Sequence, residues 1–295
     1  MAHQIPLTPE SIADLPHPDD QTQEIAPDLA YRRLAMVNVV FFGLPQRGDR
    51  NWVLIDAGVA GLGGRIESAA CERFGEGARP AAIILTHGHF DHVGALEKLA
   101  EKWDAPIYAD ELELPYLNGS AWYPPPDPSV GGGIMPLLSP LFPRSPIDVS
   151  NRLRELPRDG SVPEMPGWKW LHTPGHSVGH VSLWRESDRA LIAGDAFITT
   201  NQESAYAVAT QAEEMHGPPR YFTPDWESAG RSVAELATLR PELVITGHGR
   251  AMRGPQMREA LNLLARDFYR IAVPEDGKYV GSPARAEDGS AYPAA

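Results

Sequence analysis

Cysteine is almost absent from this sequence, since Cys71 is the only one. A single thiol cannot form an intrachain disulfide, and it excludes a metal site built from several cysteines. Cys71 lies in the stretch 65–75, RIESAACERFG, whose apolar spacing and final glycine predict a helix. We expect this cysteine to be packed or half-packed on that helix rather than to act as a nucleophile.

Long apolar runs are also lacking. No segment approaches the roughly 18 apolar residues that a membrane-spanning helix needs. Residues 1–20 contain no basic segment followed by an apolar run, which is the pattern of a secretory signal. We therefore expect a cytoplasmic protein with no membrane partner.

Basic residues are in the minority. Lys and Arg number 26 against 39 Asp and Glu, which gives a net charge of −13, and the arginines are scattered along the chain. An acidic surface repels phosphodiester backbones, so nucleic acid is not an expected partner. A small-molecule substrate fits this composition better.

The chain divides by composition into an arm, one domain and a tail. Residues 1–30 are polar and proline-dotted and predict an N-terminal arm, residues 31–275 predict a single domain, and residues 276–295 predict a C-terminal tail. The segment 115–166 is rich in Pro and Gly, so regular structure in it must be sparse. Its embedded apolar and aromatic residues favour either a lid over a site or a contact in a homodimer.

Within the domain, strand patterns alternate with helix patterns. Short apolar runs predict strands, and 3.6-residue apolar spacing predicts the helices between them. The expected strands are 34–44, 51–58, 81–86, 105–110, 167–173, 181–187, 189–195 and 242–247, and the expected helices are 65–75, 94–103, 229–239 and 257–272. This order predicts a layered α/β architecture, with 34–44 and 51–58 forming a hairpin.

The string Thr86-His-Gly-His-Phe-Asp-His92 directly follows the expected strand 81–86. In extended backbone, side chains alternate, so His87, His89 and Asp91 would project to one side, with His92 facing a second point. Three imidazoles and a carboxylate within six residues suit Zn, Mn or Fe ions better than a structural role.

Three further ligand-type residues each follow an expected strand and a small residue. They are His176 in HTPGH, Asp195 in AGD and His248 in GHG. Each is a weak indication alone, because such residues are common in turns. Loops at one edge of a sheet can, however, bring their side chains to one site.

Taken together, the His-x-His-x-Asp-His string, the later His, Asp and His motifs, and LIDAG at 54–58 resemble the metallo-β-lactamase superfamily over about residues 35–250. The resemblance implies a four-layer αββα sandwich of two mixed sheets with outer helices. It implies two divalent metal ions, most readily Zn²⁺, with Mn²⁺ or Fe²⁺ as alternatives. One ion would be held by His87, His89 and His176 and the other by Asp91, His92 and His248, with Asp195 bridging them.

The pattern is most similar to the glyoxalase II and lactonase branches. It implies that a hydroxide shared by the metals attacks a carboxylic ester, lactone or thioester carbonyl, with Asp91 also receiving or relaying a proton. One class of true β-lactamases has cysteine where this chain has Asp195, so antibiotic hydrolysis is not expected. Two alternatives remain: a mononuclear iron enzyme similar to persulfide dioxygenases, and, less favoured by the acidic composition, a phosphodiesterase of the same superfamily.

Other polar and aromatic residues have weaker claims. His172 and His180 flank His176, and we expect ordinary hydrogen bonds rather than support of the ligands. His216 is expected on a solvated loop, and an anion-binding role for Arg220 is not favoured. Tyr221, Phe222 and Trp226 predict either an apolar pocket wall or packing under loops.

Overall fold

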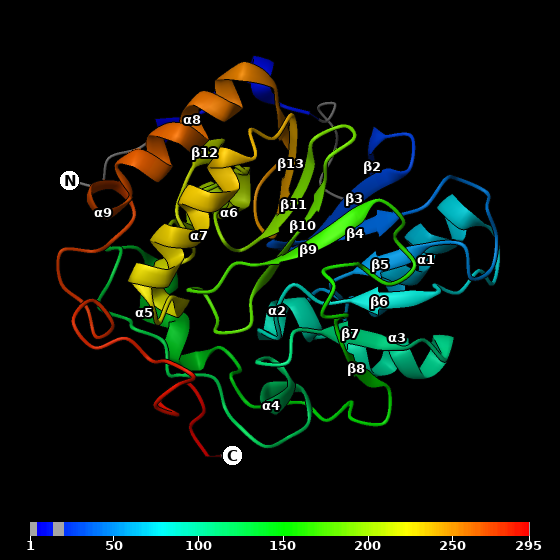
Figure 1. Ribbon diagram of the computed structural model, residues 1–295, viewed down its shortest axis with the longest axis horizontal. Helices are drawn as coiled ribbons and strands as arrows, with labels where there is room; N and C mark the ends of the chain where they lie inside the picture. Colours follow the sequence, from blue (N-terminus) through cyan, green and yellow to red (C-terminus); the bar gives the residue numbers. More distant parts are fainter. Residues whose placement is uncertain (1–4, 14–20, 295) are drawn as a thin grey trace.

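The computed structural model describes residues 5–13 and 21–294. Two mixed β-sheets lie face to face, and helices cover the outer face of each one (Figure 1). The larger sheet has the strand order β2-β3-β4-β5-β6-β7-β8 and the smaller one β14-β13-β11-β10-β9. The predicted α/β class with four αββα layers is confirmed.

The seven-stranded sheet changes from antiparallel to parallel pairing along its width. Its strands are β2 (Gln23–Ala26), β3 (Leu29–Leu34), β4 (Val37–Phe42), β5 (Val53–Ile55), β6 (Ala82–Ile84), β7 (Ile107–Ala109) and β8 (Leu153–Glu155). Pairs from β2 to β5 are antiparallel, which includes the predicted hairpin of β4 and β5, and pairs from β5 to β8 are parallel. Helices α1 (Gly63–Phe74) and α3 (Leu96–Trp103) connect parallel strands and pack on its outer face.

The five-stranded sheet comes from the second half of the chain. Its strands are β9 (Trp168–His172), β10 (Val181–Arg185), β11 (Ala190–Gly194), β13 (Leu243–Thr246) and β14 (Met252–Arg253). Only the pair of β11 and β13 is parallel, because the connection between these strands includes helix α7 (Trp226–Thr238). Helix α7 packs on the outer face with α8 (Gly254–Arg266) and α9 (Phe268–Ile271). A separate pair joins β1 (Ile5–Pro6) to β12 (Glu214–Met215).

Alternating side chains explain why the sheets stack in this way. On β5, Val53 and Ile55 belong to the core between the two sheets, whereas Leu54 belongs to the core under α1 and α3. The same division holds on β6, where Ile84 faces the other sheet and Ile83 faces the helices. Strands that are apolar on both faces must be covered on both, which gives two inner and two outer layers.

The remaining described segments are short elements and irregular loops. In the expected arm 1–30, residues 1–4 and 14–20 lie outside the described residues, while Ile25 and Leu29 are buried on β2 and β3. The short elements are η1 (Pro9–Ser11), α2 (Phe90–Val93), α4 (Leu114–Leu117), α5 (Ile134–Leu138), η2 (Ser139–Leu141), α6 (Ala205–Thr210) and η3 (Arg220–Phe222). Regular structure in 115–166 is accordingly sparse.

Two further expectations concern exposure. Cys71 is exposed on α1, so the expectation that it is packed is wrong. The reason is that it follows Ala70 on the helix and points away from the face that packs on the sheet. Within the described ranges, no helix has both the length and the apolar character needed to cross a bilayer.

We predict that Trp52→Ala destabilises the fold by about 3–5 kcal/mol, because it leaves a large cavity that the neighbouring side chains cannot fill. Trp52 is 1% exposed, stacks on Phe74 with ring centroids 4.6 Å apart, and meets Trp103 edge-on at 5.5 Å. Urea unfolding followed by circular dichroism measures the change. The control Tyr206→Ala alters a side chain that is 76% exposed and should stay within about 0.5 kcal/mol of the parent. Equal effects of the two substitutions would contradict the prediction.

Candidate metal centre

The candidate ligands lie on four connections at one edge of the sandwich. His87 and His89 follow β6, and His176 follows β9. Asp195 comes directly after β11, and His248 comes two residues after the end of β13. The predicted arrangement of strand, small residue and ligand therefore does bring these side chains to a common place.

The string 86–92 is not extended throughout, as it was expected to be. His89 has extended backbone, with φ −63° and ψ 152°, but Phe90–Val93 form the helix α2. The amides of His92 and Val93 both donate to the carbonyl oxygen of His89, which starts this helical turn. Strand-like alternation consequently does not explain the position of Asp91, which is set by the helix.

All seven predicted residues come together. In each of three overlapping groups, one ligand atom per residue lies within 4.8 Å of the others, the groups being His87, His89 and His176; His87, His92 and Asp195; and Asp91, His92 and His248. The first and third groups are the two ligand sets implied by the resemblance, while the second contains the expected bridge.

The Asp195 carboxylate lies at the centre of this cluster. Its Oδ2 is 3.4 Å from His176 Nε2, 3.6 Å from His92 Nε2 and 3.0 Å from His248 Nε2. It therefore faces one histidine of the first set and two of the other. The close approach depends on Gly247, where a Cβ would lie 2.0 Å from Asp195 Oδ1.

Several buried polar atoms of the cluster have no hydrogen-bonding partner among the described residues. They are His87 Nε2, His92 Nε2 and Asp195 Oδ1. His89 Nδ1 and His176 Nε2 lie 2.9 Å apart, facing one another. Buried nitrogen and oxygen atoms are normally satisfied, so convergent unsatisfied ones fit a bound cation. Imidazole and carboxylate donors of this kind suit divalent transition metals.

The pKa shifts of the clustered histidines also agree with a bound cation. Burial lowers the pKa of His89 to about 3 and holds the pKa values of His87 and His176 well below the ordinary value, which keeps these imidazoles neutral and able to bind metal. At His92 and His248, burial opposes the charged form, but the Asp195 carboxylate outweighs it and raises both pKa values. That half of the cluster therefore favours positive charge, which a divalent ion supplies.

Hydrogen bonds at the far side of the rings fix their orientation. His92 Nδ1 donates to Asp56 at 2.8 Å, and His248 Nδ1 donates to the Met36 carbonyl oxygen at 2.6 Å. Asp56 also accepts from the backbone N–H and the hydroxyl of Thr86, both at 2.8 Å. Such contacts leave Nε2 free to face the centre and hold each ring in place.

The weaker histidine candidates have three different positions. His180 is fully buried, and its Nε2 accepts the backbone N–H of Asp195 at 2.9 Å, so the less favoured interpretation, support of a ligand, is correct for it. His172 is exposed and contacts the carbonyl oxygen of Val178. His216 is not on a solvated loop, because it is 4% exposed and pairs with Glu203 at 3.0 Å.

The aromatic candidates and Arg220 also lie in different surroundings. Phe222 lies beside the cluster, with its ring centroid 5.0 Å from that of His89. Tyr221 is buried in a small apolar cluster, and Trp226 is buried in the core under α7 and α8. Arg220 donates to the carbonyl oxygens of residues 271 and 272, which is a structural use of its guanidinium group.

Sequence reasoning missed Glu113, a fully buried carboxylate between two ligand loops. Its Oε2 accepts from the Gly88 amide at 2.9 Å and from the Tyr123 hydroxyl. Its Oε1 accepts from the Ser177 hydroxyl at 2.7 Å and the Gly179 amide at 3.0 Å. Glu113 thus ties the loop of His87 and His89 to the loop of His176. No motif surrounds it, and its partners are distant in sequence.

We predict that Glu113→Ala weakens metal binding by about 10–100-fold, since both loops lose a shared anchor and the buried Gly179 amide loses its acceptor. Glu113→Gln should have a smaller effect, because one of its terminal atoms still accepts. Competition with a chromophoric chelator measures the affinity. Glu111→Ala is the matched control, as this neighbouring side chain is exposed and pairs with the exposed Arg158 at 3.3 Å. Unchanged affinity in Glu113→Ala would show that this carboxylate does not position the ligands.

Comparison with known proteins agrees with this geometry. A family model described as the metallo-beta-lactamase superfamily matches residues 32–248. The probable metallo-hydrolase YflN of Bacillus subtilis is 50% identical over 236 residues, which cover 80% of this chain and 89% of that protein. The probable metallo-hydrolase YqgX of the same bacterium is 34% identical over 204 residues, covering 68% of this chain and 81% of its own.

Solved structures support the fold alone. A beta-lactamase domain protein from Burkholderia ambifaria has a TM-score of 0.58 at 19% identity, and the match covers 88% of this chain and 80% of that one. The family match spans most of the chain and includes all seven clustered residues. Membership of this family, with its His and Asp groups, implies divalent metals. The chain belongs to the metallo-β-lactamase superfamily, as its motifs predicted.

Proposed function

We propose that this protein is a dinuclear metal-dependent hydrolase of small substrates that carry a carboxylic ester, lactone or thioester. The observation behind the proposal is the position of Asp195 Oδ2 between histidines of both ligand sets. A carboxylate in this position can contact two cations at once, and a second cation gives a use to the ligand-type residues that one cation would leave over. The names of the relatives, which are probable metallo-hydrolases, support the same class of reaction.

The ligand chemistry favours Zn²⁺, with Mn²⁺ and Fe²⁺ as alternatives. When bound, two such ions would lower the pKa of a water towards about 7 and polarise a carbonyl oxygen. The chain contributes fixed geometry: Asp195 sets the separation of the two sets, and Asp56 and His180 keep His92 and Asp195 from turning away. Fixed donors of this kind need no reorganisation during the reaction.

Asp91 is the proposed catalytic residue as well as a ligand. Its Oδ2 lies 3.5 Å from His248 Nε2. Burial raises the pKa of its carboxyl group, while the nearby His92 and His248 act against that shift. Because Asp91 would lie beside both the attacking water and the leaving group, we propose that its carboxylate takes a proton from the water and passes it to the leaving oxygen or sulfur.

The two alternatives make different demands on the residues. A mononuclear iron dioxygenase would use three ligands, typically two histidines and one carboxylate, which leaves four of the seven clustered residues without a purpose. A phosphodiesterase would have to attract a polyanion to a chain with a net charge of −13. A dinuclear hydrolase of neutral or weakly charged acyl compounds would use all the clustered residues and would not have to attract a polyanion.

We predict about two equivalents of zinc or another divalent ion per chain when the protein is purified without added metal. Elemental analysis gives the stoichiometry, and a panel of lactones, esters and thioesters gives the activity, which chelation should abolish. One iron per chain, oxygen consumption and no hydrolysis would instead establish the dioxygenase alternative.

We also predict that Asp195→Ala lowers both metal content and kcat, the latter by more than about 100-fold, since removing a ligand should exceed the effect of removing its support. The matched control is Asp159→Ala, because this exposed carboxylate accepts hydrogen bonds from Ser161, which is close to it in sequence. Full turnover of Asp195→Ala at normal metal occupancy would overturn the bridging assignment.

A further inference from the structure

Asn38 is a buried polar residue in the otherwise apolar strand β4. Its side chain is 2% exposed, and its neighbours Val37 and Val39 are completely buried. Because side chains alternate along a strand, Asn38 points to the same side as Val40, which belongs to the core between the two sheets, whereas Val39 faces the outer helices. Asn38 is therefore directed from the seven-stranded sheet towards the five-stranded one.

The backbone that carries His248 lies opposite Asn38. The Nδ2 of Asn38 donates to the Thr246 carbonyl oxygen at 2.9 Å and to the Gly249 carbonyl oxygen at 2.7 Å. The backbone amide of Asn38 donates to the Gly247 carbonyl oxygen at 2.7 Å. One residue of β4 thus holds the chain both before and after this metal-ligand candidate, from which it is far away in sequence.

The two acceptors define how the amide group of Asn38 is turned. Carbonyl oxygens only accept hydrogen bonds, so the group that faces both of them must be the NH₂, which has two hydrogens to donate. The other atom, Oδ1, is buried and has no hydrogen-bonding partner among the described residues. An unpaired buried oxygen costs free energy that an apolar side chain of similar size would avoid. Space filling alone therefore does not account for an asparagine at this position, whereas its two donated hydrogen bonds do.

The turn before β4 and a second segment complete the support of His248. Met36, two residues before Asn38, accepts the hydrogen bond from the ring, at His248 Nδ1. On another side of the loop, the Thr199 amide donates to the His248 carbonyl oxygen at 3.1 Å, and a Cβ at Gly249 would lie only 2.4 Å from Thr199 Oγ1. Without the Asn38 side chain, the loop would lose two of its ties to the first sheet while the others remained.

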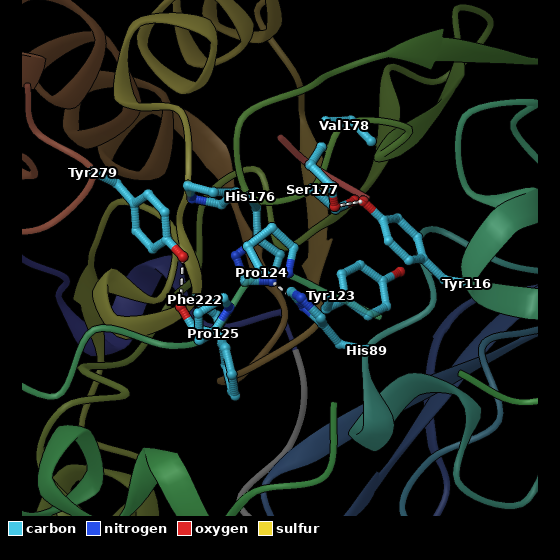
Figure 2. Close-up of a pocket in the computed structure, with 12 residues that line it drawn as sticks. His89, Tyr116, Tyr123, Pro124, Pro125, His176, Ser177, Val178, Phe222 and Tyr279 are labelled. Atoms are coloured by element: carbon cyan, nitrogen blue, oxygen red, sulfur yellow. Dashed lines mark hydrogen bonds between the residues drawn. The ribbon is translucent and has the colours of Figure 1, made fainter. Parts of the chain in front are cut away.

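The first ligand set is held from a different direction. Figure 2 shows His89 and His176 facing one another, with Tyr123 and Phe222 beside them. The described lining of this space includes no residue of β4 and none of the loop after β13. The loops of His89 and His176 are joined by Glu113 instead. A change at Asn38 should therefore leave the first set in place.

We infer that Asn38 is a positioning residue for His248, and that metal binding by the second ligand set, which consists of Asp91, His92 and His248, depends on its amide group. This inference rests on the proposed function, because it takes each ligand set to hold one ion. It adds that the second ion is held through hydrogen bonds between the two sheets, since β4 keeps the loop after β13 in place. Asn38 acts only through the position of His248 and is not itself a ligand.

Competition between the metal-loaded protein and a chromophoric chelator for Zn²⁺ resolves the two binding steps. In Asn38→Ala we expect one ion to bind as in the parent and the other about 10–100-fold more weakly, the usual effect of removing a residue that orients a ligand. Asn38→Leu fills the space of the amide without its donors and should show the same selective loss, which separates lost hydrogen bonds from lost packing. Parental affinity for both ions in Asn38→Leu would overturn the inference. Equal weakening of both ions in the two variants would also overturn it, because general loss of structure has that effect.

Asn51→Ala is the matched control. The Nδ2 of Asn51 also donates to two carbonyl oxygens, those of Arg47 at 3.2 Å and Asp49 at 2.8 Å, but this side chain is exposed and its acceptors are close in sequence. Asn51 precedes β5, whereas Asp56, which contacts the metal centre, follows that strand. Both ions should bind to Asn51→Ala as they do to the parent, and a selective loss equal to that of Asn38→Ala would contradict a specific role of Asn38.

A double variant with Asn38→Ala and Glu113→Ala identifies the ligand set that is affected. Glu113 supports the first set, so the two substitutions should act on different ions and neither ion should keep its parental affinity. If one ion still binds as in the parent, both substitutions act on the same set, and the assignment of Asn38 to His248 is wrong.

The outcomes separate this inference from the function on which it rests. If the parent protein binds two ions and hydrolyses members of the substrate panel, but Asn38→Leu keeps both ions at parental affinity, the inference fails while the hydrolase proposal stands. If the parent binds a single ion, the proposed dinuclear function fails and the inference fails with it.

Discussion

The arrangement of the whole centre depends on a carboxylate, Asp195, buried where the two sheets end. A charged group in a protein interior is costly unless compensating charge surrounds it. Here the compensating charge comes from His92 and His248, and the neutral His176 reaches the same oxygen from a third connection. The strands β9, β11 and β13 must therefore end at one level, and the loops after them must turn inward. The metal centre and the edge of the sandwich are in this sense one structural feature.

A second set of buried acids converts loops into fixed parts of that centre. Asp56 joins the end of β5 to Thr86 and His92, and Glu113 joins the His89 loop to the His176 loop. Loops are ordinarily the mobile parts of a fold, whereas ligands of a metal must be held with little freedom. Hydrogen bonds to a shared carboxylate hold such loops, because one buried side chain accepts several hydrogen bonds at once. Asp56 has a positive φ of 61°, a conformation uncommon for a residue with a side chain, and the network around it holds it there.

Much of the fold and of the metal centre could be predicted from the sequence, because these features depend on local patterns. Apolar runs gave the inner strands, and the close spacing within 86–92 gave four of the clustered residues before any geometry was known. The prediction failed where local and tertiary preferences compete, as at Asp91, whose place is set by a helical turn that follows His89. It could not find Glu113, since its role is defined by amides 25 and 66 residues away. His216 was misjudged for the same reason: only the fold brings Glu203 to it.

The segments without periodic pattern are held by hydrogen bonds between side chains and backbone. Residues 115–166 and 277–294 contain little regular structure, and Tyr116 and Tyr279 each donate from one of these segments to a carbonyl oxygen of the other. When tyrosine hydroxyls are used up in this way, only their ring faces remain for a ligand. The lining beside His89 and His176 is apolar for this reason as well as by composition. The same hydrogen bonds therefore fix the irregular chain and leave aromatic ring faces beside the metal centre.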